Sequence, residues 1–356
     1  MRVLVLASSL RTVGNFSPVL DAMRHRRDDV ELAWVPLGSS MHENPGATGI
    51  SRVHAPPPGK VSQASCGDFW AALERWMRST RFDVVLMDDM IHWPSRELSA
   101  MLANLSPRPA SIAFQHGLHQ AWNAMNDDFH VDFLLCFGAR HVVNFDAWLW
   151  PRVLPVGVPK LDRVTPAELV GDHILYVAQS APTPELMGPL LADIERRTGL
   201  PVKIRAHPGH AGLYASLAKK FAFVPQSQDI LEQISASSWM LSTHSTAALE
   251  GMYLGKPVVL LPSFGLTDFT FFPGVCVDFS AEKVLVALRK HRDDHKGRAR
   301  FLRQVCGGLR HDATQRSLAV IDRIVAGKGA DIHRTLDEHP LNAACVMQAG
   351  VSGVAR

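Results

Sequence analysis

The stretch WMLSTHSTAALEGMYLGKPVVLLP, residues 239–262, joins two apolar runs through a hydroxyl-rich turn and a short segment of helical pattern. The apolar runs predict buried strands at Trp239–Leu241 and Pro257–Leu261, and the segment between them predicts a helix at Ala247–Leu254. Gly255 follows the last helical residue, where glycine commonly ends a helix. A strand, a helix and a second strand in this order form one unit of a parallel sheet, so the stretch indicates the α/β class.

The turn between the first strand and the helix is rich in hydroxyl groups. It consists of Ser242, Thr243, His244, Ser245 and Thr246. Small hydroxyl residues that open a helix leave backbone N–H groups facing outward at the positive end of the helix dipole, which suits a phosphate. Glu250 follows Thr246 by four residues and shares its helix face, so it could meet the ribose of a nucleotide. The alternative is a capped crossover helix that binds no ligand.

Strand and helix patterns alternate along the chain in two rounds. Continuous apolar runs such as Arg2–Ala7 are typical of strands in a parallel sheet that is covered on both faces. The proline-rich segment Arg152–Asp162 separates the two rounds. We therefore expect two doubly wound, Rossmann-like domains that face each other across a cleft. The expected boundaries are residues 1–160 for the N-terminal domain, 161–330 for the C-terminal domain and 331–356 for a tail.

Two further segments have clear patterns. The tryptophan-rich segment Arg140–Trp150 predicts a helix, and Gly38–Lys60, which is rich in Gly, Pro and Ser, predicts a long surface loop.

The composition is that of a globular protein. The chain has 356 residues, of which 47% are hydrophobic and 20% charged. Its formal net charge of +3 is too small to indicate a nucleic-acid partner. The five cysteines are far apart and form no C-x-x-C pair, which favours a reducing compartment over a disulfide framework or a structural zinc. No apolar run approaches the roughly 18 residues of a membrane span. We expect a cytoplasmic protein.

The segment Glu282–Arg310 is strongly basic, with nine Lys and Arg residues against three Asp and Glu residues. One interpretation is a solvated helical face. The other is a surface that meets an anionic polymer or an anionic membrane, which would place the protein at the inner face of that membrane.

Polar residues gather where the predicted strands end, and ligands of open α/β sheets bind beyond the carboxyl ends of the strands. His207 closes the strand of KIRAHP before a proline, so its imidazole would project at the strand tip and could donate to a phosphate oxygen. Arg205 or Lys203 would add charge nearby, although a lone histidine is more often structural. Gly14 and Ser180 lie in two other clusters of this kind and are candidates for lining the cleft.

Candidates for acid–base chemistry follow two predicted strands of the first domain. His116 follows one strand, and the adjacent Gly117 would let backbone come close to a ligand, so His116 is a candidate base for an acceptor hydroxyl. Asp88 and Asp89 are paired carboxylates at another strand end. They could act as a base or cap the next helix.

These motifs together resemble the GT-B glycosyltransferases. Within them the chain is most similar to the group that contains the CDP-glycerol glycerophosphotransferases of teichoic acid synthesis and the bacterial capsule polysialyltransferases and Kdo transferases. The motifs that carry the resemblance are FQHG at 114–117, VGVPKLD at 156–162, ILYVAQS at 174–180, RAHPGH at 205–210 and STHSTAALEGMYLGKPVVLLP at 242–262.

The resemblance implies a GT-B fold with an N-terminal acceptor domain and a C-terminal nucleotide-donor domain. It implies that His207 and the turn from Ser242 to Thr246 hold the phosphate of the donor, that Glu250 lies near the ribose, and that His116 faces the acceptor. The expected function is metal-independent and cofactor-free transfer of a sugar or glycerol phosphate from a CMP-, CDP- or UDP-linked donor. The acceptor would be a glycan or glycolipid of a capsule or another bacterial surface polysaccharide.

Two alternatives come from other classes. An isomerase of the UDP-GlcNAc 2-epimerase kind shares the two-domain fold, but it needs several carboxylates from the first domain. A non-catalytic protein that binds a sugar nucleotide on the same scaffold would lack turnover altogether.

Overall fold

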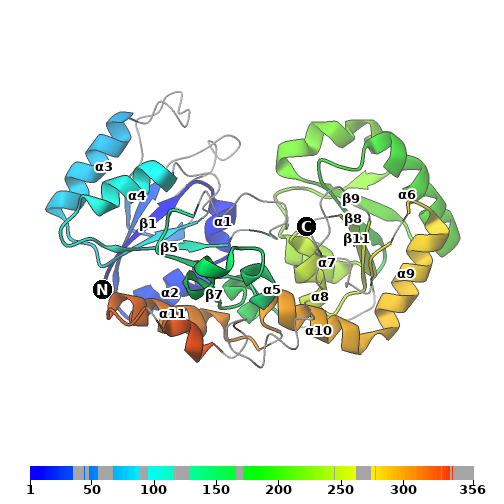
Figure 1. Ribbon diagram of the computed structural model, residues 1–356. Coiled ribbons are helices and arrows are strands. Elements are labelled where there is room, and N and C mark those ends of the chain that lie inside the picture. The colour runs from blue at the N-terminus through cyan, green and yellow to red at the C-terminus, as the bar shows by residue number, and fades with distance from the viewer. Residues whose placement is uncertain are drawn as a thin grey trace. The chain divides into compact units, whose positions relative to one another are not determined.

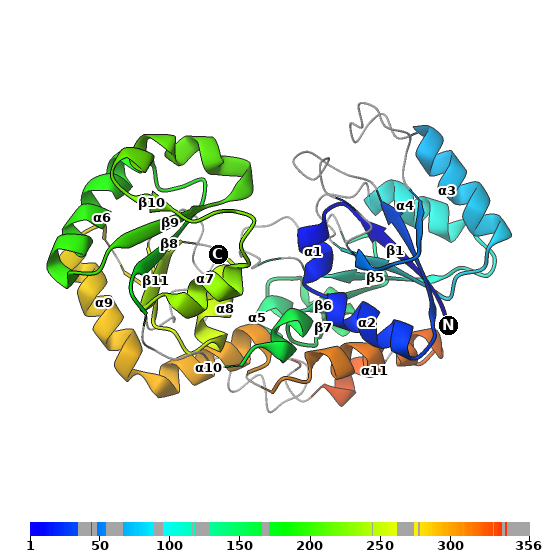
Figure 2. The same ribbon diagram turned by 180° about the vertical axis from the view of Figure 1, so that it is seen from behind.

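The structure of the chain is a computed structural model, which Figures 1 and 2 show from opposite sides. It describes residues 1–34, 44, 48–54, 67–88, 95–115, 117, 129–165, 171–243, 245–261, 274–276, 278–308, 310–329, 331–336 and 339.

The chain divides into two compact units, each with its own parallel sheet. Unit 1 consists of Met1–His116, Asn123–Asp162 and Gln304–Arg356, and unit 2 consists of Gly117–Trp122 and Arg163–Arg303. Two doubly wound α/β units confirm the expected fold class. The boundary at Asp162 lies close to the expected one. From Gln304 onward, however, the chain returns to unit 1, where the sequence had indicated the continuation of the second domain.

Unit 1 is built on a seven-stranded parallel sheet in the order β3-β2-β1-β4-β5-β6-β7. Its strands are β1 (Arg2–Ala7), β2 (Asp29–Trp34), β3 (Arg52–His54), β4 (Val84–Met87), β5 (Ala110–Phe114), β6 (Phe133–Cys136) and β7 (Val153–Pro155). From β1 the chain first adds β2 and β3 on one side, and then crosses to the other side with β4. The point where the strand order reverses, the switch point, therefore lies between β1 and β4, and such points commonly bind ligands.

Helices cover both faces of this sheet. They are α1 (Leu10–Gly14), α2 (Ser17–His25), α3 (Gly67–Ser79), α4 (Ser95–Ala103), α5 (Ala139–Val142), η3 (Ala147–Arg152), η4 (Pro159–Arg163), α11 (Ala313–Val325) and η7 (Ile332–Thr335). Successive residues of a strand point to opposite faces. Leu4 and Leu6 accordingly pack in the cluster of α3 and α4, whereas Val3 and Val5 pack in the cluster of α2 and α11. Figures 1 and 2 both show α11 beside α2 on one side of the sheet.

Unit 2 is built on a five-stranded parallel sheet in the order β10-β9-β8-β11-β12. Its strands are β8 (Ile174–Ala178), β9 (Val202–Ala206), β10 (Ala222–Phe223), β11 (Trp239–Ser242) and β12 (Val258–Leu260). The switch point of this sheet lies between β8 and β11. The deciding stretch of the sequence thus supplies one side of a switch point, which strand assignment alone did not reveal.

The helices of unit 2 also form a layer on each side of the sheet. They are α6 (Pro184–Thr198), η5 (Pro208–Lys219), α7 (Ile230–Ala236), α8 (Ala247–Tyr253), α9 (Ala281–Asp293) and α10 (His295–Cys306), of which the last turn belongs to unit 1. Buried residues of α6, η5 and α9 share one hydrophobic cluster with the sheet. The short helix α8 is buried along its whole length, and a Cβ on Gly251 would lie 2.3 Å from the sulfur of Met240. Glycine therefore lets α8 approach β11 closely.

Asp162 of the motif VGVPKLD and Gly138, which precedes α5, contact the returning C-terminal segment. The two carboxylate oxygens of Asp162 accept hydrogen bonds from the backbone N–H groups of Ala313 (3.0 Å) and Thr314 (2.6 Å). This carboxylate caps the N-terminus of α11, where a negative charge is favourable. Gly138 makes a second contact, because a Cβ there would lie 2.5 Å from the carbonyl oxygen of Gln304. The return of the chain thus requires an acid and a glycine far away in sequence.

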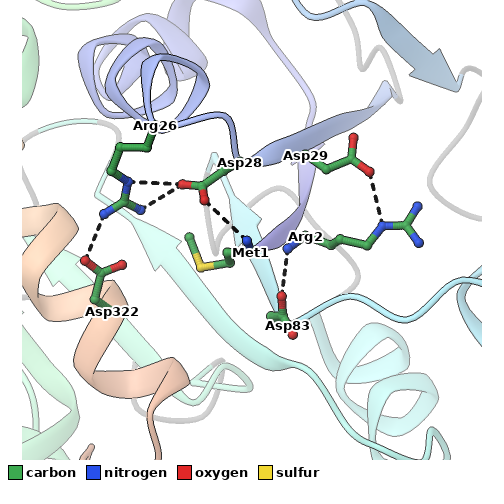
Figure 3. A network of polar contacts seen from close by, with 7 residues as sticks. All are labelled: Met1, Arg2, Arg26, Asp28, Asp29, Asp83 and Asp322. Atoms are coloured by element: carbon green, nitrogen blue, oxygen red, sulfur yellow. Dashed lines mark hydrogen bonds and ion pairs between the residues drawn. The ribbon is translucent and has the colours of Figure 1, made fainter.

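A network of charged groups also joins α11 to the start of the chain (Figure 3). The guanidinium of Arg26 pairs with Asp28 at 2.8 Å and with Asp322 of α11 at 2.8 Å, and Asp28 also accepts from the amine of Met1 at 3.3 Å. These groups are partly exposed, so each pair contributes only about 0–1 kcal/mol. The network orients α11 more than it stabilises it.

Two predictions about local structure are wrong. The helix expected at Arg140–Trp150 is broken: α5 ends at Val142, and the 3-10 helix η3 begins at Ala147 after an extended Asp146. Pro151 and the hydrogen bond from the Trp150 indole to the carbonyl of Phe145 suit this tighter turn. Of the loop expected at Gly38–Lys60 the structure describes residues 44 and 48–54, and this part contains the edge strand β3, which is three residues long and leaves little pattern to detect.

Cys136, Cys276 and Cys306 are buried, and none of the three forms a disulfide with another described residue. Cys66 and Cys345 lie outside the described residues. Within the described residues, no helix has the length and apolar character needed to cross a membrane.

Candidate functional site

The switch point of unit 2 is held by two buried hydroxyl groups. Ser242 is the last residue of β11, and its hydroxyl donates to the carbonyl of Val177 at 3.1 Å. The hydroxyl of Thr243 donates to the carbonyl of Ala181 at 3.3 Å. Both residues have no exposed surface. They were expected to contact a phosphate, but they instead join β11 to β8 and to the loop after β8.

The turn that follows comes closer to the surface. Ser245 and Thr246 are partly exposed, and α8 begins directly after them. The N–H of Ala247 donates to the hydroxyl of Ser245 at 3.2 Å. The next three N–H groups, at residues 248–250, donate to the carbonyls of Ser245 and Thr246. The expectation of free N–H groups in the first turn of this helix is therefore wrong. What remains for an anion here is the hydroxyl pair and the positive end of the helix dipole.

His207 and His210 stand at the end of the neighbouring strand β9. The N–H of His207 donates to the carbonyl of Ala178 at 3.0 Å, which continues the ladder between β8 and β9 by one residue. The rings of His207 and His210 lie 5.1 Å apart between centroids. His207 is partly exposed. The sequence therefore placed His207 correctly at a strand tip, whereas His210 of the same motif RAHPGH was given no role of its own.

Arg205 does not project from the strand tip as a free cation. Its guanidinium donates to the carbonyl of Gln228 at 2.8 Å and holds the loop after β10. Burial lowers the pKa of Arg205, and the nearby carboxylates of Asp229 and Glu250 oppose that shift. Glu250 itself is 6% exposed. The charges of Arg205 and Glu250 therefore attract each other within unit 2.

Gly117, the last residue of the motif FQHG, lies close to the turn before α8. A Cβ at Gly117 would lie 3.3 Å from the hydroxyl oxygen of Thr246, and both residues belong to unit 2. Gly117 therefore lies close to Thr246, and the close approach to a ligand expected at this glycine stays a prediction. The expected roles of His116, His244 and Asp89 fall on residues outside those described, so these roles stay predictions.

The switch point of unit 1 is closed by the carboxylate of Asp88. Its Oδ2 accepts from the N–H and hydroxyl of Ser8 (2.7 and 3.0 Å), the N–H of Ser9 (3.1 Å) and the hydroxyl of Thr12 (2.6 Å). Asp88 has no exposed surface. It was predicted either to be a base or to cap the helix that follows it. The structure shows a third role, because the carboxylate fixes the loop after β1 and the start of α1.

Gln115, the second residue of FQHG, also has a structural role that the sequence did not suggest. Its Oε1 accepts from the N–H of Phe137 at 2.8 Å, and its Nε2 lies 3.3 Å from Nδ1 of His141. Burial lowers the pKa of His141 to about 3, and a backbone hydrogen bond to Val305 opposes that shift. His141 is therefore neutral and accepts from Gln115. The position of Gln115 beside the histidine of FQHG was the one sequence feature that could have indicated a role for it.

The two remaining cleft candidates have different surroundings. Ser180 is exposed directly after β8, at the same edge as the Ser245–Thr246 turn. Gly14 lies at the end of α1, and a Cβ there would meet no atom within 4 Å, so Gly14 marks no close approach. Among the residues that the structure describes, no cluster of His, Cys, Asp and Glu could hold a metal ion.

No protein-family model and no curated protein matches this chain. Solved structures do match it over nearly its whole length. The UDP-GlcNAc 2-epimerase of Methanocaldococcus jannaschii aligns with a TM-score of 0.62 at 12% identity, covering 90% of this chain and 99% of that one. The epimerase of Neisseria meningitidis bound to UDP-GlcNAc aligns at 0.64 and 12%, covering 90% and 99%. A glycosyltransferase of Rickettsia africae aligns at 0.60 and 10%, covering 91% and 98%. The chain therefore has the GT-B type of fold, with two Rossmann-like α/β domains, that these epimerases and this transferase share.

Proposed function

We propose that this protein is an enzyme that binds a nucleotide sugar at the carboxyl edge of the unit 2 sheet and changes or transfers the sugar. The observation that carries the proposal is the set of polar groups at adjacent strand ends on either side of β8. Ser180 follows β8, His207 follows β9, and Ser245 and Thr246 follow β11. All are at least partly exposed at the edge where ligands of open α/β sheets bind.

The nucleotide phosphates would lie against the turn of Ser245 and Thr246. Hydroxyl groups at the positive end of α8 favour an anion, and His207 would supply a further donor. Glu250 follows one turn deeper in the same helix and would accept from the ribose hydroxyls. Because the Neisseria meningitidis epimerase binds UDP-GlcNAc on the same fold, a UDP-sugar is the first ligand to test, and CMP- and CDP-sugars are the next.

The first candidate reaction is epimerisation at C2 of UDP-GlcNAc. The matches to these epimerases cover 90% of this chain and 99% of each epimerase, so they include both α/β domains and support this candidate. Such a reaction removes and returns a proton at carbon, so it requires an acid and a base beside the sugar. In this chain those groups would come from the segments around His116 and Asp89.

The second candidate is transfer of the sugar, or of glycerol phosphate, to a glycan or glycolipid of the bacterial surface. A specific observation favours it. Asp88 is the one described carboxylate that directly follows a strand of the unit 1 sheet, and its Oδ2 already accepts four hydrogen bonds from the loop after β1 and from α1, so we do not assign it an acid–base role. Transfer needs one base, for which His116 suffices, whereas epimerisation needs a second acid–base group.

Binding is tested by thermal shift with UDP, CDP, CMP and GDP. A ligand at a hundredfold excess over its dissociation constant stabilises the folded state by about 2.7 kcal/mol. We expect Thr246→Val to weaken nucleotide binding about tenfold, because a hydrogen bond to a charged group is lost. The matched control is Thr198→Val, whose hydroxyl donates to a helix carbonyl in α6. Equal nucleotide affinities of the two variants, or no stabilisation by any nucleotide, would contradict the proposed nucleotide site.

The reaction is tested by incubating the protein with UDP-GlcNAc and recording proton NMR spectra. A new anomeric signal without release of UDP means epimerisation, and release of UDP that depends on an added glycan or glycolipid acceptor means transfer. His207→Ala should lower either rate by about 10²-fold, the scale of one lost electrostatic group. His25→Ala, which changes an exposed histidine of unit 1, is the control. Binding without either product would support the non-catalytic alternative.

We also propose that unit 2 contacts an anionic membrane through α9 and α10. Seven exposed cations on these helices make no ion pair within the described residues. They are Lys283, Arg289, Lys290, Arg292, Lys296, Arg300 and Arg303. Each basic group near an anionic surface contributes about 1 kcal/mol.

Sedimentation with phosphatidylglycerol vesicles tests this contact. The combined variant Lys296→Gln, Arg300→Gln and Arg303→Gln should bind on the order of 100-fold more weakly than the unchanged protein. Arg196→Gln with Arg197→Gln is the control, because these exposed arginines of α6 already pair with Asp193. Binding of the triple variant at the original strength, or equal binding to phosphatidylcholine vesicles, would exclude an electrostatic membrane contact.

A further inference from the structure

Unit 1 contains a cavity of about 250 Å³ between the end of β7, α11 and η7. Its apolar wall includes Pro155, Val320 and Leu336. Its polar wall consists of three arginines, Arg310, Arg316 and Arg323, together with Thr335. This cavity lies wholly within unit 1 and shares no residue with the proposed nucleotide site in unit 2.

The described lining of this cavity is basic. Its lining holds three guanidinium groups and, among the described residues, no carboxylate. Nε of Arg316 pairs with Asp312 at 2.9 Å outside the lining. Arg323 is exposed and makes no ion pair with any residue that the structure describes. Arginines that face a common space repel one another, and an anion that takes their donors relieves that repulsion.

Arg316 is also placed by its surroundings. A Cβ at Gly157 would lie 3.0 Å from Nη2 of Arg316, and a Cβ at Gly307 would lie 2.9 Å from the same atom. Both glycines have positive φ, at 96° and 73°. Two stretches of backbone therefore come close to this guanidinium in a conformation that side chains rarely adopt, while Asp312 orients its Nε. Residues 316, 320 and 323 then share one face of α11.

We infer that this arginine-lined cavity binds a compact phosphate-bearing anion, at a site separate from the nucleotide site. A guanidinium can donate two parallel hydrogen bonds to a phosphate, and those of Arg316 and Arg323 at one cavity match a group that carries two or more negative charges. The Thr335 hydroxyl offers one more donor, and the apolar wall suits the carbon skeleton of a small phosphomonoester. The volume is below the range of about 300–1,000 Å³ that holds drug-sized ligands, so the ligand is small.

The test uses inorganic pyrophosphate as the probe and NMR of the full chain as the readout. Amide resonances of Val320 and Thr335 report the cavity, and those of Ser245 and Thr246 report the nucleotide site. Titrations are made at constant ionic strength, because screening alone changes exposed charges. We expect Arg323→Gln to weaken the pyrophosphate response of Val320 and Thr335 at least about tenfold, since one charge-assisted contact is lost.

The control variant is Arg334→Gln, which removes an exposed arginine that pairs with Asp331 and does not line the cavity. It should bind pyrophosphate at the cavity as the unchanged protein does. The inference is overturned if Val320 and Thr335 show no saturable response, or if both variants respond alike. Failure of UDP to shift Ser245 and Thr246 would instead contradict the proposed function, so the two failures are distinguishable.

Discussion

The switch points of the two sheets are secured by different chemistry. In unit 1 a single carboxylate oxygen of Asp88 gathers four donors from the loop after β1. In unit 2 two neutral hydroxyls, those of Ser242 and Thr243, each donate to one carbonyl. Hydrogen bonds to a charged acceptor are about twice as strong as neutral ones. The comparison indicates that the edge of unit 1 is fixed by a buried charge, whereas unit 2 keeps its next two hydroxyls, at Ser245 and Thr246, near the surface.

Burial also distinguishes the polar residues at the strand ends of the two units. Asp88 was a candidate for acid–base chemistry at a strand end, and Gln115 lies at another strand end, yet both are buried and hold backbone groups. Ser180 and His207 lie at equivalent strand ends of unit 2 and are at least partly exposed. Position at the carboxyl edge therefore selects candidates, but burial and hydrogen-bond partners decide between a structural and a binding role.

The largest effect should come from removing the charge in unit 1. Asp88→Ala leaves the N–H groups of Ser8 and Ser9 without their acceptor, and each buried unsatisfied group costs about 1–3 kcal/mol. We expect the free energy of unfolding to fall by about 4 kcal/mol in urea titrations. The control Asp83→Ala, which removes an exposed acceptor of the Arg2 N–H, should cost much less. A native urea midpoint for Asp88→Ala would show that the two switch points do not differ in this way.

The next effect concerns the buried histidine of unit 1. Burial lowers the pKa of His141 to about 3, below the usual value of 6.5 for the unfolded chain. The unfolded state therefore binds the proton first as the pH falls, so stability is complete above pH 6.5 and declines toward the folded pKa. We expect a loss of about 1.4 kcal/mol for each pH unit below 6.5, and this contribution should disappear in His141→Gln.

Urea titrations between pH 7.5 and 5.5 measure that contribution in both proteins. The control variant is His25→Gln, which replaces an exposed histidine on α2 in the same way. Parallel pH profiles for the unchanged protein and His141→Gln would mean that His141 titrates alike in both states.

A smaller effect is expected at the switch point of unit 2. Thr243→Val keeps the shape of the side chain but removes the hydrogen bond to the carbonyl of Ala181. The cost should be about 1 kcal/mol, the net value of a typical neutral hydrogen bond. Urea titration beside Asp88→Ala tests the ratio directly. If Thr243→Val lowered the free energy of unfolding as much as Asp88→Ala, the two switch points would not differ in the strength of the hydrogen bonds that hold them.

The smallest effect should come from the exposed network in Figure 3. Arg26→Gln breaks the pairs with Asp28 and Asp322, and partly exposed pairs contribute about 0–1 kcal/mol. High salt should reduce even this difference, because it screens exposed charges. A loss comparable to that of Asp88→Ala, measured at the same salt concentration, would show that this network does more than orient α11.

Much of the fold could be predicted because strands of a parallel sheet are continuous apolar runs. The strand predicted at Arg2–Ala7 is β1 residue for residue, and the opening stretch contains β11, α8 and β12 within one residue of their expected ends. The 3-10 helix η3 and the edge strand β3 were missed, because short or irregular elements are set by their neighbours more than by their own pattern.

The candidate site was predictable in position and only partly in role. The end of an apolar run predicts the end of a strand, and this placed His207 and Thr246 at one edge of the unit 2 sheet. The partners of Ser242 and Asp88 are 65 and 80 residues away in sequence. No local pattern reports a hydrogen bond across that distance, so these side chains looked available although they are buried.

By itself, then, the sequence determined the α/β class, the two rounds of strands and helices, and the edge at which polar groups gather, because these depend on local hydrophobic periodicity. Only the tertiary structure decided that the chain from Gln304 returns to unit 1, that Asp162 caps α11, and that three arginines line one cavity. The same holds for the stretch at residues 239–262. Its strands could be predicted from the sequence. Which of its hydroxyls hold the sheet and which remain near the surface depends on carbonyl groups that are distant in sequence and that folding brings within hydrogen-bonding distance.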